Sequence, residues 1–150
     1  MKLSTKGRYA ARAMLELAEA YGSGPVKLSR IACRQEISER YLERMMHALV
    51  KAELIFSIRG QKGGFQLSNP PSEIRLSTVI QAVEGSLALV ACVDSPGICH
   101  RHESCVTTDV WERVKLAILD VLDSITLEDM LEMQRRKSAI PRKTIHTKRG

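Results

Sequence analysis

Residues 28–67 combine two short helical patterns with an alternating segment, and few folds accommodate this combination. Apolar residues recur on one helical face over residues 28–35 and again over 39–52, with a three-residue turn between them. Residues 55–67 then alternate apolar and polar side chains on either side of a glycine-rich centre, 60–64, which predicts a β-hairpin. Helix, turn, helix and hairpin in this order predict a winged helix-turn-helix.

Further helices are predicted on both sides of this unit. Ser4 or Thr5 can cap a first helix that runs to about Tyr21. Ser77 can cap another helix over residues 78–83. With these helices, the winged helix-turn-helix accounts for the first 85 residues of the chain.

A long helix is predicted over residues 106–124, followed by a short helix that Thr126 and Asp129 cap and that ends near Met133. Apolar residues recur along the long helix at alternating spacings of three and four, as in a coiled coil. This seam consists of Trp111, Val114, Ile118, Val121 and Ile125. Such a seam needs a covering partner, and we expect a second copy of the chain, with packing on the winged helix as the alternative.

The fold class predicted from these patterns is mainly α with a small β-hairpin wing, built as a winged helix-turn-helix plus a long C-terminal dimerisation helix. Four segments are expected along the chain: the winged helix-turn-helix domain over 1–85, a loop with three cysteines over 86–105, the dimerisation helix and short terminal helix over 106–133, and a basic disordered tail over 134–150.

Charge is distributed unevenly along the chain. Residues 1–75 carry 13 Lys and Arg against 7 Asp and Glu, residues 76–133 carry 3 against 10, and residues 134–150 carry 7 against none. A basic N-terminal half favours a polyanion as its partner. Aromatic residues make up only 4% of the chain, which argues against a base-stacking platform.

The chain contains no run of 18 apolar residues, which excludes a transmembrane helix. We expect no membrane partner. Residues 1–8 contain no apolar core of a signal peptide, so we expect a cytoplasmic protein. Because cytosolic cysteines are kept reduced, the four cysteines are expected to be ligands, redox groups or core residues rather than structural disulfides.

The second helix of the helix-turn-helix has a polar face suited to double-stranded DNA. The major groove admits one α-helix, whose N-terminal residues reach base edges, and a hairpin tip can contact phosphates or enter the minor groove. A solvated helix face and an exposed hairpin tip are the alternative explanations. The candidate DNA-binding residues are Ser38, Arg40, Tyr41, Glu43, Arg44, His47, Ser57, Arg59, Gly60 and Lys62.

Cys92, Cys99 and Cys105 lie together in an irregular segment, where their thiolates can converge on one centre. Soft thiolates favour an iron–sulfur cluster, zinc or cuprous copper. Three thiolates are one short of the usual four ligands, and the local candidates for the fourth are His100, His102, Glu103 and Asp94, with water, a small molecule or the partner subunit as other sources.

Several alternatives remain for these cysteines. Zinc held by Cys92, Cys99, His102 and Cys105 competes with a cluster. A redox-switching disulfide or ordinary core cysteines are also open. Cys33 lies between apolar positions of a helix and is expected to be a small core or surface residue.

Four motifs of the chain resemble those of the Rrf-type winged-helix regulators, in particular the IscR-like iron–sulfur regulators. They are Thr5-Lys6-Gly7-Arg8-Tyr9-Ala10, Ile37-Ser38-Glu39-Arg40-Tyr41-Leu42-Glu43, Ile58-Arg59-Gly60-Gln61-Lys62-Gly63-Gly64-Phe65 and Ile125-Thr126-Leu127. The resemblance runs over about residues 1–133. It implies a homodimeric bacterial transcription regulator, activator or repressor, that controls genes of iron–sulfur assembly or a related stress response.

The resemblance also assigns roles to individual residues. It implies that Cys92, Cys99 and Cys105 hold the cluster, that Glu43 takes part in reading a cytosine, and that Arg59 enters the minor groove from the wing. Family members with a two-iron cluster carry a histidine where this chain has Thr108, and others recruit an acid where it has Arg8.

The spacing of the cysteines also departs from the family pattern. The family's usual spacing is five residues in both gaps, whereas the first gap here has six. These departures leave the fourth ligand open, and of the two cluster types we favour [4Fe–4S] over [2Fe–2S].

Because the cysteines lie between the DNA-binding half and the predicted dimer helix, we expect the cluster to control how the two recognition helices face DNA. A zinc- or thiol-dependent winged-helix regulator is the main alternative, and an iron–sulfur electron carrier is a weaker one. No enzyme is expected, since the chain shows no phosphate-binding glycine loop and no Ser/His/Asp constellation.

Overall fold

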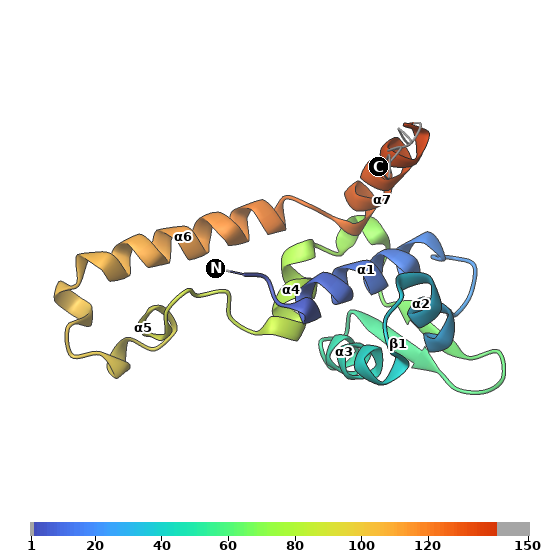
Figure 1. Ribbon diagram of the computed structural model, residues 1–150, viewed down its shortest axis with the longest axis horizontal. Helices are drawn as coiled ribbons and strands as arrows, with labels where there is room; N and C mark the ends of the chain where they lie inside the picture. The colour runs from blue at the N-terminus through green and yellow to red at the C-terminus, as the bar shows by residue number, and fades with distance from the viewer. Residues whose placement is uncertain (1, 141–150) are drawn as a thin grey trace, which may run out of the picture.

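The computed structural model describes residues 2–140 and consists mainly of helices, with one small antiparallel hairpin (Figure 1). The elements are α1 (Thr5–Glu19), α2 (Leu28–Gln35), α3 (Glu39–Lys51), β1 (Ile55–Ile58), β2 (Gly64–Leu67), η1 (Pro71–Glu73), α4 (Leu76–Glu84), α5 (Ala91–Asp94), η2 (Pro96–Ile98), η3 (His102–Ser104), α6 (Val106–Asp123) and α7 (Leu127–Ala139). This confirms the predicted fold class. Over residues 2–140, no helix is both long and apolar enough to span a bilayer.

Helix α1 lies at the centre of the body, with α2, α3, α4 and α7 in contact with it. Its apolar positions recur at helical spacing, so one face is buried along the whole helix; Ala10, Ala13, Met14 and Leu17 are at most 2% exposed. Leu42, Met46 and Leu49 of α3 pack into the same core. The core therefore fixes the helix-turn-helix through the buried face of α3 and leaves the opposite face of α3 exposed.

A carboxylate at the end of α4 joins that helix to the start of α1. Glu84 accepts hydrogen bonds from the backbone N–H of Gly7, at 2.9 Å, and from the hydroxyl of Ser4. A negative charge at a helix N-terminus interacts favourably with the unpaired N–H groups and the helix dipole. A Cβ on Gly7 would lie 2.8 Å from Oε1 of Glu84, so a larger residue there would displace this carboxylate from the helix N-terminus.

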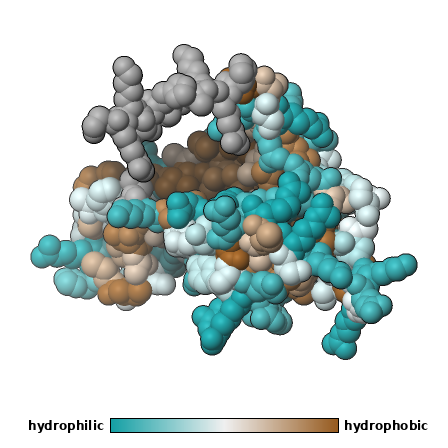
Figure 2. Space-filling model, turned by 45° about the vertical axis from the view of Figure 1, so that its right-hand side comes forward, coloured by the Kyte–Doolittle hydropathy of each residue, from teal (hydrophilic) through white to brown (hydrophobic). Residues whose placement is uncertain are grey.

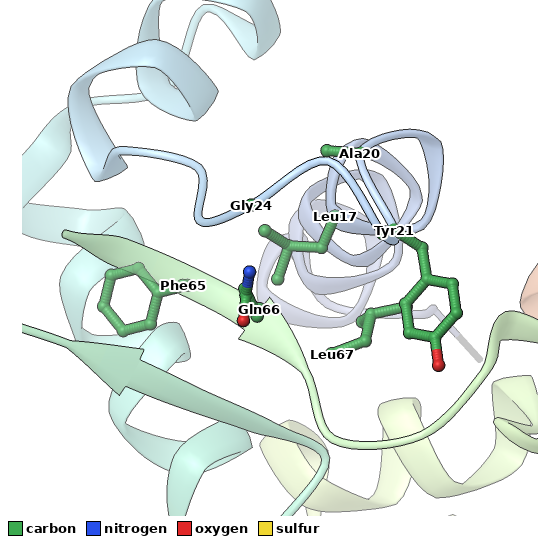
Figure 3. Close-up of a pocket in the computed structure, with 8 residues that line it drawn as sticks. Leu17, Ala20, Tyr21, Gly24, Phe65, Gln66 and Leu67 are labelled. Atoms are coloured by element: carbon green, nitrogen blue, oxygen red, sulfur yellow. The ribbon is translucent and has the colours of Figure 1, made fainter. Parts of the chain in front are cut away.

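The hairpin pairs Ile55 with Leu67 and Ile58 with Gly64, and a third segment supports it. Val26, just before α2, exchanges two backbone hydrogen bonds of 2.9 Å with Phe65. Figure 3 shows the neighbouring cavity, of about 300 Å³, between the C-terminal end of α1 and β2. The two hydrogen bonds between Val26 and Phe65 attach the hairpin to the segment that leads into the helix-turn-helix.

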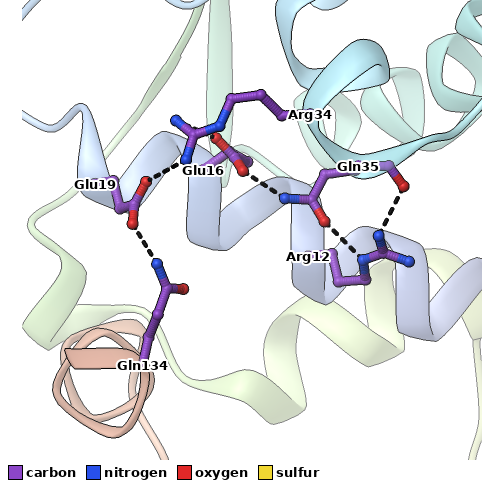
Figure 4. A network of polar contacts seen from close by, with 6 residues as sticks. All are labelled: Arg12, Glu16, Glu19, Arg34, Gln35 and Gln134. Atoms are coloured by element: carbon purple, nitrogen blue, oxygen red, sulfur yellow. Dashed lines mark hydrogen bonds and ion pairs between the residues drawn. The ribbon is translucent and has the colours of Figure 1, made fainter. Parts of the chain in front are cut away.

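A polar network connects α1, α2 and α7 (Figure 4). Arg34 of α2 pairs with Glu16 at 3.1 Å and with Glu19 at 3.3 Å, both on α1. Gln35 donates to Glu16, and Gln134 of α7 donates to Glu19. Glu16 is only 7% exposed, so little water reaches its carboxylate. Arg34 and Gln35 stabilise the carboxylate in place of water.

Two of the predicted boundaries are wrong. Helix α4 begins at Leu76 with Arg75 as its N-cap, because Ser77 is buried and donates its hydroxyl hydrogen bond to Asp123 instead of capping. Helix α7 does not end near Met133 but continues to Ala139, so the first six residues of the predicted basic tail are helical. The remainder of that tail, residues 141–150, lies outside the described residues.

Helix α6 extends away from the body, and the segment 86–105 runs beside it in Figure 1. Only Thr108 is buried among the residues of α6. Segment 86–105 is more ordered than the predicted loop, since it contains α5 and two short 3-10 turns. An ion pair between Lys115 and Asp94, at 2.6 Å, fastens this segment to α6.

Candidate nucleic-acid interface and cysteine site

Helix α3 presents a charged outer face because its apolar residues all point into the core. Its first turn is capped by Ser38, whose hydroxyl accepts from the backbone N–H of Tyr41 at 3.3 Å. Arg40, Glu43, Arg44 and His47 are exposed. None of the four forms an ion pair or side-chain hydrogen bond with another described residue. Their charges therefore remain available to an external partner.

Tyr41 differs from the other candidates on α3. It is half-buried, and its ring packs edge-to-face on Tyr9 of α1, with ring centroids 5.9 Å apart. The guanidinium of Arg12 lies 5.4 Å from the centre of the Tyr9 ring and that of Arg8 lies 6.0 Å away. Tyr41 thus helps to seat α3 on α1, and two arginines of α1 lie close to this contact.

The tip of the hairpin is exposed and carries Arg59, Gly60 and Lys62. Gly60 has a φ of 107°, a conformation that favours glycine. Ser57 on β1 is exposed as well. Hydrophilic side chains project from the lower edge of the molecule in Figure 2, the edge at which α3 and the hairpin lie in Figure 1. Helix α3 and the hairpin, which carry the predicted DNA-binding residues, therefore lie at the same edge of the molecule.

The cysteine segment places two of its three thiols at the start of α6. Cys105 is the N-cap residue of α6, and its sulfur lies 3.1 Å from the hydroxyl of Thr107. Cys92, on α5, has its sulfur 3.9 Å from the hydroxyl of Thr108. Cys99 lies between the two 3-10 turns. All three cysteines are half-buried and none forms a disulfide.

The surroundings of Cys105 favour its thiolate. Hydrogen bonds from the Thr107 hydroxyl, and then from the hydroxyl and backbone of Thr108, lower the pKa of the Cys105 thiol to about 7. A thiolate is the form that binds soft metals. Hydroxyls that donate to sulfur are a feature that reasoning from the cysteine spacing alone did not anticipate.

In the described part of the chain, no three His, Cys, Asp or Glu side chains are close enough to hold a single metal ion. The donor set nevertheless fits a cluster or zinc in its chemistry, because it consists of soft thiolates and an imidazole. One atom also lacks a partner: Nδ1 of His102 is shielded from solvent and makes no hydrogen bond with any described residue. The donor types therefore suit such a group, whereas the arrangement of residues 2–140 does not bring three of these side chains together.

Helix α6 carries an exposed apolar stripe. Val106, Val110, Trp111 and Val121 are between 37% and 74% exposed, which is unusual for large apolar residues of one helix. Within the predicted seam, Val114, Ile118 and Ile125 are half-buried. Packing within the chain, on α4 and α5, thus covers the seam only in part.

Comparison with known proteins agrees with these features. A sequence model of the Rrf2 family, described as "Iron-dependent Transcriptional regulator", matches residues 3–133. The structure of IscR from T. potens superposes with a TM-score of 0.74 at 41% identity and covers 95% of this chain and 94% of its own.

Two further relatives carry the names of different regulators, IscR and CymR. The transcriptional regulator IscR of Sodalis glossinidius is 36% identical over 99% of this chain and 90% of its own length. CymR, the global cysteine regulator of B. subtilis, superposes with a TM-score of 0.72 at 37% identity and covers 89% of this chain and 98% of its own. The chain belongs to the Rrf2 family of helix-turn-helix transcription regulators, a family without enzymatic activity.

Proposed function

We propose that the chain is a cytoplasmic, homodimeric regulator of the IscR type, in which an iron–sulfur cluster held by Cys92, Cys99 and Cys105 controls binding to operator DNA. The observation that carries the proposal is the position of two thiols at the first turn of α6, the helix with the exposed apolar stripe. A change at these thiols acts directly on the helix that would join the two copies.

The DNA contacts are assigned to α3 and the hairpin. Arg40, Arg44 and His47 extend from α3 toward a major groove, and Glu43 can accept from a cytosine amino group. Ser38 and Tyr41 stand at the first turn of α3, where phosphate or base edges come near. From the hairpin, Arg59 enters the minor groove, while Ser57, Gly60 and Lys62 lie against phosphates.

The chain itself supplies the connection between the two sites. Helix α4 contacts α1, α3 and α6, so it touches both the DNA-binding body and the dimer helix. Asp123 at the end of α6 accepts from Ser77 of α4, and its backbone oxygen accepts from Arg75. When bound, the cluster would supply a centre that is sensitive to oxidants and to iron supply. Its retention would hold segment 86–105 against α6 and so bias the placement of the two recognition helices.

Anaerobic purification tests the proposal, with an absorption spectrum and counts of iron, sulfide and zinc per chain. We expect iron and sulfide in the wild type and in Cys33→Ala, the matched control with a cysteine outside the segment, and neither in the variant with alanine at 92, 99 and 105. Zinc without sulfide in the wild type would overturn the cluster.

DNA binding is measured on duplexes enriched from a random pool by the cluster-containing protein. We expect the triple variant to change its affinity for these duplexes at least about tenfold, which corresponds to 1.4 kcal/mol. If it binds all of them like the wild type, the cysteines do not control DNA binding.

A thiol switch without metal is the second candidate, because Cys92, Cys99 and Cys105 are all free. It predicts a colourless protein under strict anaerobic conditions and a change of DNA affinity that mild oxidation alone produces. The same purification therefore separates the two candidates.

A further inference from the structure

The guanidinium of Arg12 on α1 is held in one position although its side chain is exposed. Its Nε donates to Oε1 of Gln35 at 2.6 Å, and Nη2 donates to the backbone oxygen of Gln35 at 2.7 Å. Its centre lies 5.4 Å from the centroid of the Tyr9 ring. In Figure 4 the third nitrogen of Arg12 points away from Gln35 and has no partner among the residues drawn. An arginine fixed in this way loses little further conformational freedom when it binds a ligand.

This arginine lies where the two helices of the helix-turn-helix meet. Gln35 is the last residue of α2, and Ser38 caps α3 three residues later. The ring of Tyr9, beside the guanidinium, packs on the ring of Tyr41 in the first turn of α3, with the centroids 5.9 Å apart. A recognition helix inserts its N-terminal part into the major groove, whose edges are formed by the phosphate backbone. A phosphate at that edge is therefore expected close to Arg12.

Positive charge surrounds Arg12 on α1. Lys6, Arg8 and Arg12 are exposed, and no Asp or Glu precedes Glu16 in the chain. Arg8 lies four residues before Arg12, so both side chains lie on the same face of the helix, and the Arg8 guanidinium is 6.0 Å from the centroid of the Tyr9 ring. Neither arginine forms an ion pair with a carboxylate of the described residues. Within residues 2–140 their charges are not neutralised, which favours an anionic partner.

We propose that Arg8 and Arg12 bind the phosphate backbone of DNA beside the groove that α3 enters. Helix α1 is then a third DNA-contacting element, in addition to α3 and the hairpin. Guanidinium groups suit this role because their N–H donors match the geometry of phosphate oxygens. The site rests on the DNA binding proposed above and is independent of what the cysteines hold.

A phosphate bound to α1 would position the whole DNA-binding body. Helix α1 is in contact with α2, α3 and α4 and with β2 of the hairpin. A contact to phosphate carries no sequence information but fixes the register and orientation of the protein on the duplex. The two arginines would therefore set how α3 and the hairpin meet the DNA, while residues of α3 read the bases.

The salt dependence of DNA binding tests the proposal. Fluorescence anisotropy gives the affinity for two duplexes, one enriched from a random pool by the wild type and one of scrambled sequence, over a range of potassium chloride concentrations. We expect Arg8→Gln and Arg12→Gln each to lower the slope of log K against log salt by about 1 per protomer and to weaken binding to both duplexes by a similar factor. Arg135→Gln, at an exposed position of α7 far from α3 in Figure 1, is the matched control and should keep the wild-type slope.

Two of the variants separate a phosphate contact from a structural role. Arg12→Lys keeps the charge but cannot reproduce both hydrogen bonds to Gln35, so it should keep the wild-type slope if the charge meets a phosphate. The Arg8 side chain forms no ion pair with a described residue, so Arg8→Gln should leave the thermal unfolding of the protein unchanged.

The results also distinguish a wrong site from a wrong function. If both glutamine variants keep the wild-type slope, or if Arg12→Lys lowers the slope as much as Arg12→Gln does, α1 does not bind phosphate and the DNA-binding function stands. A wild type that binds neither duplex overturns that function and this site with it.

Discussion

Two adjacent glycines shape the hairpin at the scale of single residues. A Cβ on Gly63 would lie 2.0 Å from the backbone oxygen of Ile58, and a Cβ on Gly64 would lie 2.4 Å from that of Val26. Both contacts are with backbone, which cannot rotate away as a side chain can. The glycines of this motif therefore serve the close packing of the hairpin on itself and on the segment before α2.

For this reason Gly63→Ala should distort the hairpin. We expect a loss of about 1–3 kcal/mol in the free energy of unfolding, as for other forced overpacking, together with weaker DNA binding. Chemical denaturation and fluorescence anisotropy measure the two effects. Gly97→Ala is the control, because no atom of the described residues lies within 4 Å of a Cβ at that position. Equal stability of the two variants would contradict the prediction.

Glu43 should act on specificity more than on affinity. It is an exposed carboxylate on a face that also carries Arg40 and Arg44, and near phosphates its charge is unfavourable unless it accepts a base hydrogen bond. We expect Glu43→Ala to lower discrimination at one cytosine-containing base pair by about 1–3 kcal/mol. Competition between matched and single-substituted duplexes measures this. Glu73→Ala, at an exposed carboxylate of η1, should leave discrimination unchanged.

At the scale of elements, the Glu16 network determines how α2 sits on α1. Glu16→Ala removes the carboxylate that pairs with Arg34 and Gln35 at a position that little water reaches. We expect the free energy of unfolding to fall by about 1–3 kcal/mol, in line with hydrogen bonds to charged groups. Denaturant titration measures it. Glu112→Ala, at an exposed position of α6, should lie within about 0.5 kcal/mol of the wild type, the usual range for surface substitutions.

Asp129 makes the start of α7 sensitive to acid. Hydrogen bonds from the backbone N–H and then the hydroxyl of Thr126 hold the pKa of its carboxyl below the usual 3.8. A lowered pKa in the folded state stabilises the protein above pH 3.8, and this contribution disappears as the pH falls through the folded-state value.

We therefore expect Asp129→Asn to lower the Tm at pH 7 and to have a progressively smaller effect below pH 3.8. Thermal unfolding across this pH range measures the difference between variant and wild type. Asp109→Asn, in the first turn of α6, is the comparison for loss of a carboxylate without a capping box. A difference that grows toward low pH would contradict the assignment.

At the scale of the whole molecule, the exposed stripe of α6 distinguishes a monomer from a dimer. Val121 belongs to the stripe at 59% exposure, whereas Leu116 is 57% exposed but lies about 140° away around the helix, at 100° per residue. We expect Val121→Lys to abolish the dimer in sedimentation equilibrium and Leu116→Lys to leave it intact. Dimers of equal stability in both variants would rule out this face as the interface.

Much of the fold was predictable because local patterns and tertiary packing agree in the helix-turn-helix. The apolar periodicity of α2 and α3, the Ser38 cap, and the alternation around Gly60–Gly64 each specify their element without distant contacts. The Thr126–Asp129 capping box was equally local. Ser77 was misassigned because its hydroxyl partner, Asp123, lies 46 residues away. The C-terminal end of α7 was misplaced because the segment after Met133 is polar and basic; the structure makes it helical, with Gln134 donating to Glu19 of α1 and residues 135–139 exposed.

The sequence alone determined which residue types occur on α3, on the hairpin and in the cysteine segment. It also determined the family, because the motifs that indicate the family consist of residues close together in the chain. Only the tertiary structure decided which of those groups find partners. It seats Tyr41 on Tyr9, brings Cys92 to Thr108 and leaves Nδ1 of His102 without a hydrogen-bond partner among residues 2–140. Burial and hydrogen bonding depend on chain segments that meet only after folding, and no local pattern encodes them.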